Sequence, residues 1–202
     1  MNALAVGGVA FLAGAIPFSN IAARLRAGVD LRDVGSGTVS GTALFEVAGF
    51  GALAVAGILD VAKGALGPVL AGSDRPVVAA VAAGLAVAGH DWSPFLHGAG
   101  GRGVSPAIGA LAVLAWPGAV LLLLALAVGR LVHETALAVF VADLALVPLA
   151  AGTHGAAGAL GAAAVVLPML LKRLLGNASP ALHGPRAYAE RLLFDRDPRP
   201  AG

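Results

Sequence analysis

Long runs of apolar residues, separated by short polar segments, make up most of the chain. The runs cover about 3–23, 43–70, 76–90, 105–129, 136–151 and 155–171. About 20 apolar residues suffice to cross the hydrocarbon core of a membrane as a helix. A transmembrane β-barrel would instead alternate apolar and polar residues, and no such alternation is visible. The pattern predicts an all-α fold, a polytopic transmembrane helix bundle.

The run at 105–129 admits two topologies. It is long enough for one tilted helix, but Pro117 at its middle lacks a backbone N–H and favours a break. Two helices here give seven membrane helices in all, and one helix gives six. Two helices also bring all the basic segments to the same side of the membrane. We therefore expect seven helices, with the N-terminus outside.

Basic residues predict which side of the membrane each loop faces. Eleven of the 13 Lys and Arg residues lie at 24–32, at 102, at 130 and in the stretch from 172 to 199. Cytoplasmic loops of membrane proteins carry an excess of Lys and Arg. We expect a single transmembrane helical domain at 1–175 and a polar cytoplasmic tail at 176–202, with an amphipathic helix at 186–194. Lys172 and Arg173 are interpreted as cytoplasmic anchors.

Composition supports a membrane protein and excludes several other classes. Hydrophobic residues make up 58% of the chain and charged residues 12%, with a mean hydropathy of +0.89. Soluble domains have roughly a quarter of their residues charged. There is no cysteine, so neither a disulfide nor a thiolate metal site is available. The basic tail also carries acidic residues and few aromatics, and we expect no nucleic-acid partner.

The first polar stretch, 30–38, is a candidate anion site. Glycines and hydroxyl residues in such a turn can direct backbone N–H groups at an anion, and the helix that follows adds its dipole. The same residue types also form ordinary helix N-caps, so both interpretations stay open. The candidate phosphate-binding residues are Arg32, Gly35, Gly37, Thr38 and Thr42, with Ser36 as a candidate catalytic residue.

The second polar stretch, 89–103, holds a histidine at the end of an apolar run and an arginine among glycines. Glycines let a backbone approach a ligand closely, and a guanidinium offers a rigid fork to a phosphate. We take His90 and Arg102 as candidate catalytic residues and Gly100, Gly101 and Gly103 as phosphate-binding ones. A metal site made of His90, Asp91 and His97 fits no standard spacing, and we expect no metal.

Ionisable residues also fall inside the apolar runs. Asp60 and Lys63 lie three residues apart, on one face of the predicted second helix. Intramembrane charges are costly and usually mark a functional cavity, so Lys63 is a further candidate phosphate ligand. A structural ion pair within one helix is the alternative. Glu46 and Asp143 fall in predicted helices as well.

Four segments together resemble the acyl-phosphate-dependent glycerol-3-phosphate acyltransferases of bacterial membranes. They are Gly14-Ala-Ile-Pro-Phe-Ser, Asp30-Leu-Arg-Asp-Val-Gly-Ser-Gly, Leu59-Asp-Val-Ala-Lys-Gly64 and the stretch from Gly89 to Gly103, in that order. They run from about 14 to 104, half of the chain. Their order and spacing make the resemblance fairly specific.

The resemblance implies a fold and an activity. Members of this family have seven transmembrane helices with their polar motifs on the cytoplasmic side. They transfer an acyl group from acyl phosphate to the 1-hydroxyl of glycerol 3-phosphate, which gives lysophosphatidate for phospholipid synthesis, without a cofactor. The implied partners are acyl phosphate, glycerol 3-phosphate and membrane lipid, in the bacterial plasma membrane. Ser36 and Gly37 match the phosphate-binding turn, and Arg102 stands where the family usually has lysine.

The chain departs from the family pattern at several positions. Thr38 and Ala43 replace two asparagines of the first loop, and Glu46 replaces an arginine. The C-terminal His-Arg-x-Asn-Ile-x-Arg-Leu motif aligns with 167–174, where Leu167 and Leu170 replace its His and Asn. Losing one positioned hydrogen-bonding group from such a site costs roughly 10²–10³ in rate. The alternatives to an acyltransferase are a catalytically impaired relative that binds lipid or a partner, and a small transporter.

Overall fold

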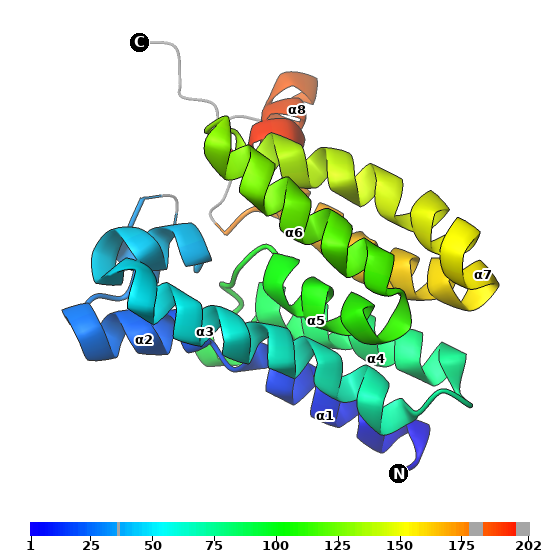
Figure 1. Cartoon of the computed structure of the whole chain (residues 1–202). Helices are drawn as coiled ribbons and strands as arrows, with labels where there is room; N and C mark the ends of the chain where they lie inside the picture. The colour runs from blue at the N-terminus through cyan, green and yellow to red at the C-terminus, as the bar shows by residue number, and fades with distance from the viewer. Residues whose placement is uncertain (36, 178–183, 197–202) are drawn as a thin grey trace.

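Helices connected by short loops form nearly all of the described part of the chain. The structure is a computed structural model that describes residues 1–35, 37–177 and 184–196. The helices are α1 (Ala3–Ala15), α2 (Phe18–Ala27), η1 (Leu31–Asp33), α3 (Gly41–Ala71), α4 (Pro76–Asp91), η2 (Pro94–Leu96), α5 (Val104–Leu114), α6 (Trp116–Leu131), α7 (Thr135–Leu175) and α8 (Pro185–Phe194). Within these ranges there is no β-strand, and the all-α prediction is confirmed (Figure 1).

Three segments of the described chain are long and apolar enough to cross a membrane: Ala3–Ala27, Gly41–Ala71 and Thr135–Leu175. The first differs from the single helix expected at 3–23, because it breaks between α1 and α2. Pro17 stands at the break and has no N–H to continue a helical ladder. The predicted helices at 43–70 and 76–90 match α3 and α4 to within two residues.

The segment 105–129 forms two helices, α5 and α6, that meet at Ala115. The chain reverses direction between them (Figure 1), and a Cβ on Gly118 of α6 would lie 3.4 Å from Leu111 of α5. A second reversal divides α7 at Gly155, where φ is 62° and ψ is −154°. Its two arms correspond to the helices expected at 136–151 and 155–171. The structure thus confirms separate elements here, while the number of membrane crossings stays a prediction.

Small residues allow the helices to pack closely. A Cβ on Gly109 of α5 would overlap the carbonyl oxygen of Val61 in α3, and one on Gly14 of α1 would overlap that of Ala86 in α4. Such contacts suit membrane helices, whose association depends on close van der Waals packing. The largest apolar core joins α4, α5, α6 and both arms of α7, around Val87, Leu111, Leu122, Leu146 and Met169.

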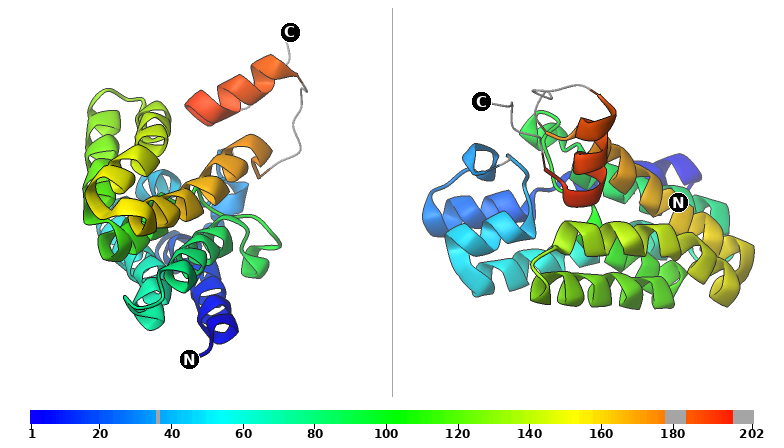
Figure 2. Two further views of the ribbon diagram at one scale, coloured as in Figure 1. Left: turned by 90° about the vertical axis from the view of Figure 1, so that its right-hand side faces the viewer. Right: turned by 90° about the horizontal axis from the view of Figure 1, so that it is seen from above.

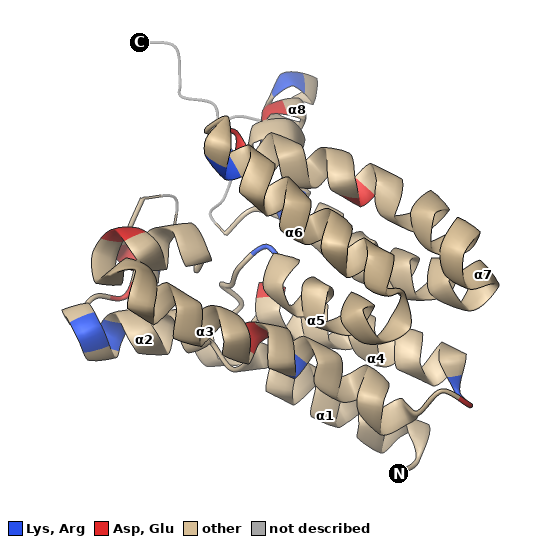
Figure 3. Cartoon of the chain, in the orientation of Figure 1, with Lys and Arg blue, Asp and Glu red and all other residues tan. Residues whose placement is uncertain are grey.

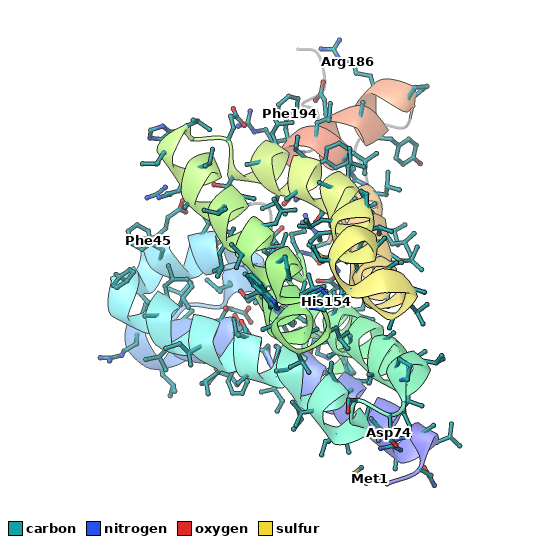
Figure 4. All side chains as sticks on the ribbon, turned by 45° about the vertical axis from the view of Figure 1, so that its right-hand side comes forward. Met1, Phe45, Asp74, His154, Arg186 and Phe194 are labelled. Atoms are coloured by element: carbon teal, nitrogen blue, oxygen red, sulfur yellow. The ribbon has the colours of Figure 1, made fainter. Side chains whose placement is uncertain are left out.

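Charged residues gather at one end of the bundle (Figure 3). We call it the motif end: it comprises α2 and the segments 28–35, 37–40, 92–103, 130–134 and 184–196. Met1 and Asp74 lie at the opposite end, far from Arg186 and Phe194 (Figure 4). Short contacts tie the motif end together, among them a hydrogen bond from Val39 N to Gly100 O of 3.1 Å. The helix expected at 186–194 is α8, which packs on α7 (Figure 2).

Candidate functional site

The two polar stretches of the sequence meet at the motif end. Arg102 Nη2 donates to Thr38 Oγ1 at 3.1 Å, across 64 residues of sequence. The backbone hydrogen bond from Val39 to Gly100 lies beside this contact. The candidate residues Gly37, Thr38, Gly100 and Arg102 are therefore neighbours, as the phosphate-site hypothesis requires.

The first loop is organised by ion pairs around Asp30. Arg24 and Arg32 both pair with its carboxylate, Arg32 through Nη2 at 2.7 Å. The hydrogen bonds from Arg32 hold the pKa of Asp30 well below its ordinary value, and the same contacts raise the pKa of Arg32. Arg32 Nη1 also lies 3.4 Å from His97 Nδ1 in the second loop. Arg32 therefore stabilises the loop through these contacts, in addition to being a candidate positive charge for a ligand.

The turn that follows Arg32 has left-handed backbone at two of its candidates, Gly35 with φ 56° and Gly37 with φ 69°. The candidate Ser36 lies outside the described residues. Thr42, in the first turn of α3, is exposed, and so is Glu46 one turn later. The acidic residue that replaces the family's arginine therefore does not enter the site.

The second loop needs its glycines because it lies against the end of α4. A Cβ on Gly101 would overlap Nε2 of His90, and one on Gly100 would overlap the carbonyl oxygens of His90 and Asp91. Gly103 has φ 71°, and a Cβ on it would lie 3.1 Å from Asp91 Oδ2. This packing fixes the backbone on both sides of Arg102, so the guanidinium projects from a rigid turn.

Arg102 stands at the centre of the site. Its Nε lies 2.7 and 2.8 Å from the two carboxylate oxygens of Asp195, which follows α8. Its Nη1 lies 3.5 Å from the carbonyl oxygen of Lys172 at the end of α7. Arg102 thus joins the second loop to Thr38, to α7 and to the residue after α8.

Asn177 was not recognised from the sequence, although it connects the two loops. Its Nδ2 donates to Gly37 O at 3.3 Å and to Gly100 O at 3.0 Å, and its Oδ1 accepts from Gly100 N at 3.2 Å. In the sequence it follows Gly176 after the last apolar run, where Gly and Asn commonly end a helix. This signal indicates a helix terminus but not a partner 77 residues away.

The interpretation of Lys172 and Arg173 as cytoplasmic anchors is wrong. Both residues are buried, at 1% and 3% exposure. Lys172 Nζ lies 3.4 Å from Gly98 O and 5.2 Å from the centre of the Trp92 ring. Arg173 Nη1 donates to Ala136 O at 2.9 Å and Leu192 O at 3.1 Å. Carbonyl oxygens and an aromatic face from neighbouring segments replace the water that an anchor would need.

A second polar cluster lies deeper, between α2, α3 and α4. Lys63 Nζ pairs with Asp60 Oδ1 at 2.7 Å and donates to Ile16 O at 2.7 Å, at the break between α1 and α2. Ser19 Oγ and His90 Nδ1 lie 3.5 and 3.8 Å from the Asp60 carboxylate. The structure thus joins two candidates, Lys63 and His90, through the Asp60 carboxylate, and His90 also packs against Gly101, the residue before Arg102.

Two further carboxylates are buried, that of Asp91 at the end of α4 and that of Asp143 in α7. Both oxygens of Asp91 and of Asp143 are buried, and neither group has a hydrogen-bond partner. Arg173 Nε lies 3.9 Å from Asp143. Among the described residues, no group of three or more His, Asp or Glu could hold a metal ion.

A small pocket, with room for about one water molecule, opens beside Arg102, between the end of α7 and α8. Its lining is mostly cationic or polar: Arg102, Arg173, Gly176, Asn177, Arg191, Asp195 and Arg196. Positive side chains around a pocket favour an anionic ligand. The charge at this pocket therefore favours an anion beside two glycine-containing loops.

Comparison with known proteins gives a consistent family. Residues 4–179 match the family model described as Glycerol-3-phosphate acyltransferase. A protein of that name from Synechococcus sp. (strain CC9902) is 34% identical over 202 residues, which cover 98% of this chain and 96% of the relative. One from Jannaschia sp. (strain CCS1) is 36% identical over 175 residues, 85% of each chain.

A solved structure agrees with these relatives. The crystal structure of PlsY (YgiH), an integral membrane glycerol 3-phosphate acyltransferase, in its glycerol 3-phosphate form, superposes with a TM-score of 0.77 and 25% identity. The superposition covers 98% of this chain and 96% of that chain. The integral membrane fold predicted from the apolar runs is therefore confirmed.

Proposed function

The chain belongs to the glycerol-3-phosphate acyltransferase family, and we propose that it transfers an acyl group from acyl phosphate to glycerol 3-phosphate. The product is lysophosphatidate, an early intermediate of membrane phospholipid synthesis. The resemblance of the four motif segments supports acyl phosphate as the donor.

The observation that carries this proposal is the contact between Arg102 and Thr38. Both substrates bear a phosphate group, and acyl transfer requires the two to lie together. A guanidinium held by a rigid glycine turn, next to a hydroxyl and a second glycine turn, provides donors of the kind that bind phosphate oxygens. The reaction requires positive charge and hydrogen-bond donors beside two phosphate groups, and the site contains groups of both kinds.

The chemistry balances without a cofactor. The 1-hydroxyl oxygen of glycerol 3-phosphate forms a bond to the acyl carbon, and the bond from that carbon to the phosphate oxygen breaks. The hydroxyl proton ends on the released inorganic phosphate. The protein has to hold two anions close together and stabilise the negative charge that develops on the acyl oxygen, which fixed donors do best.

The candidate residues receive roles on this basis. We assign Arg102, Thr38 and the backbone of Gly35, Gly37 and Gly100 to phosphate binding, and Ser36 to a hydroxyl contact in the same turn. His90, packed under Gly101, supports the second loop and offers an imidazole at its edge. Lys63, held by Asp60 and Ile16 O, stabilises the region below the site.

We also propose the orientation in the membrane and the division of the chain. The motif end, with most of the Lys and Arg residues, faces the cytoplasm of a bacterium, because cytoplasmic loops carry an excess of these residues. Residues 1–175 form the membrane domain and 176–202 the cytoplasmic tail, of which Asn177, Arg191 and Asp195 contribute to the site. The N-terminus lies outside.

A direct assay tests this function. Purified protein is incubated with an acyl phosphate and labelled glycerol 3-phosphate, and we expect labelled lysophosphatidate. Arg102→Ala should lower kcat/KM about 10²- to 10³-fold, because it removes a positioned cation from the site. Arg102→Lys keeps the charge that the family usually has here and should retain activity within about tenfold.

Arg130→Ala is the matched control. Arg130 is an exposed arginine at the motif end that packs 5.4 Å over the Phe45 ring, outside the site. Its loss should leave kcat/KM unchanged. If an active relative forms lysophosphatidate in the same assay and this protein does not, the proposed acyltransferase activity is rejected. Binding of glycerol 3-phosphate without turnover would instead favour an impaired relative, consistent with Leu167 and Leu170 in place of His and Asn.

A further inference from the structure

One carboxylate of the chain itself occupies the arginine-lined pocket between α7 and α8. Both oxygens of Asp195 lie within 2.8 Å of Arg102 Nε. The side chains of this pair are 12% and 23% exposed, so water screens them only partly. A guanidinium binds carboxylate and phosphate oxygens in similar ways. Asp195 therefore stands where an oxygen of a bound phosphate would lie.

Backbone carbonyls hold two other guanidiniums at the wall of the same pocket. Arg191 Nη1 donates to Leu174 O at 3.0 Å and Leu175 O at 3.2 Å, and Arg173 Nη1 contacts Ala136 and Leu192 in the same way. Both arginines are only 3% exposed. Their guanidinium groups add positive charge to the wall of the pocket.

Acidic residues near the pocket neutralise part of the positive charge of these arginines. Asp143 lies 3.9 Å from Arg173, and Glu134 lies 3.5 Å from Arg196. Asp195 is the acidic residue that belongs to the lining itself, and Asn177 adds an amide beside it. The contacts of Arg191 attach α8 to α7 independently of Asp195. When Asp195 leaves Arg102, α8 therefore stays attached to α7 through Arg191, but its end loses one attachment and is freer to move.

We propose that Asp195 is an internal anion that an incoming phosphate monoester must displace from Arg102. The inference rests on the proposed function, because glycerol 3-phosphate and acyl phosphate both carry such a group. It assigns phosphate-site residues to the C-terminal region, where the sequence has Leu167 and Leu170 instead of the family's His and Asn. Arg173, Asn177 and Arg191 supply polar groups there from other positions.

The Asp195→Asn variant of the full chain tests this proposal. The asparagine keeps the size of the side chain but removes the competing charge. In detergent, isothermal titration with inorganic phosphate should give a dissociation constant about five- to tenfold lower than that of the wild type. An unchanged or higher dissociation constant would overturn the proposal.

Glu190→Gln is the matched control on the same helix. Glu190 pairs with the exposed Arg186 at 3.0 Å and does not line the pocket. Its neutralisation should leave the phosphate dissociation constant within about twofold of the wild type, since exposed pairs interact weakly with distant sites. An equal gain in Glu190→Gln would mean that net charge alone is responsible, and would contradict the proposal.

A second measurement does not depend on the folding of Asp195→Asn. The chain has no cysteine, so Tyr188→Cys in α8 provides a single attachment site for a nitroxide label. Tyr188 is 44% exposed and does not line the pocket. Saturating inorganic phosphate should change the nitroxide spectrum, because the contact that holds the end of α8 is lost. An unchanged spectrum at saturation would overturn the displacement.

Competition identifies the source of the phosphate group. Displacement of bound inorganic phosphate by glycerol 3-phosphate would assign the pocket to the acceptor, and displacement by an acyl phosphate in micelles would assign it to the donor. If neither compound displaces inorganic phosphate, the pocket is not a substrate site and the proposal is rejected. None of these measurements needs turnover, so a chain that binds phosphate as expected but forms no lysophosphatidate would contradict only the proposed acyltransferase activity.

Discussion

Arg102 and Asn177 are the two side chains that connect the otherwise separate parts of the site. Arg102 contacts Thr38, Asp195 and the end of α7. Asn177 contacts the backbone of both glycine loops. One of these residues carries charge and the other carries only amide donors and an acceptor. We therefore expect Arg102 to bind the ligand and Asn177 to position the two loops.

Asn177→Ala tests the positioning role. The substitution removes three hydrogen bonds and leaves Gly100 N without its side-chain acceptor. We expect a free energy of unfolding lower by about 1–3 kcal/mol, together with a higher KM for glycerol 3-phosphate, because both loops lose their common partner. Thermal unfolding in detergent and steady-state kinetics measure the two effects.

Asn177→Asp is the informative comparison. The carboxylate can still accept from Gly100 N but cannot donate to Gly37 O or Gly100 O. If the amide acts by donating to the loops, KM should rise in this variant as well, although the acceptor is retained. If both variants keep the wild-type KM for glycerol 3-phosphate, Asn177 does not contribute to substrate binding.

At the scale of the elements, close helix contacts determine where the loops begin. α5 approaches α3 so closely that Gly109 lies against the Val61 carbonyl, and α5 starts directly after the Arg102 loop. The apolar runs predict the existence of these helices, because their hydrophobicity is a local property of the sequence. They do not predict which helices pair, since Ala, Gly, Leu and Val occur on every face.

Gly109→Ala should separate α5 from α3. The added methyl group would overlap backbone atoms, which cannot rotate away, so we expect a loss of about 1–3 kcal/mol in stability. A shift of the α5 N-terminus should also raise KM for glycerol 3-phosphate. Thermal unfolding and kinetics of the purified variant provide the measurements.

Gly57→Ala supplies the control for this change. Gly57 also lies inside a helix, α3, but a Cβ there would have no neighbour within 4 Å. Alanine is the better helix former by roughly 0.5–1 kcal/mol, so this variant should be as stable as the wild type or more so. A similar loss in both variants would show that close packing at Gly109 is not the cause.

For the whole molecule, the polar loops and the basic residues occur together at the motif end. The reversals at Ala115 and Gly155 return the chain to this end after α6 and again after the second arm of α7 (Figure 1). An uninterrupted helix at 105–129 would have placed Arg102 and Arg130 at opposite ends. The break before Pro117 thus accounts for the common location of the basic segments.

Single cysteines test the orientation of the whole molecule. Asp74 and Arg186 are exposed residues at opposite ends (Figure 4). A membrane-impermeant maleimide should label Asp74→Cys in intact cells, whereas Arg186→Cys should be labelled only in inverted vesicles. This follows from the excess of Lys and Arg expected on the cytoplasmic side. The reverse labelling pattern would contradict both the cytoplasmic site and the outward N-terminus.

The sequence by itself determined the helical class, most helix positions and the two polar loops, because hydrophobic runs, proline breaks and glycine turns act over a few residues. It also indicated Arg102 and Thr38 as candidates. Only the tertiary structure brought Arg102 to Thr38, Asn177 to Gly100 and Asp195 to Arg102, over separations of 64, 77 and 93 residues. Such contacts depend on which helices pack together, and this is decided by side-chain fit across the whole bundle.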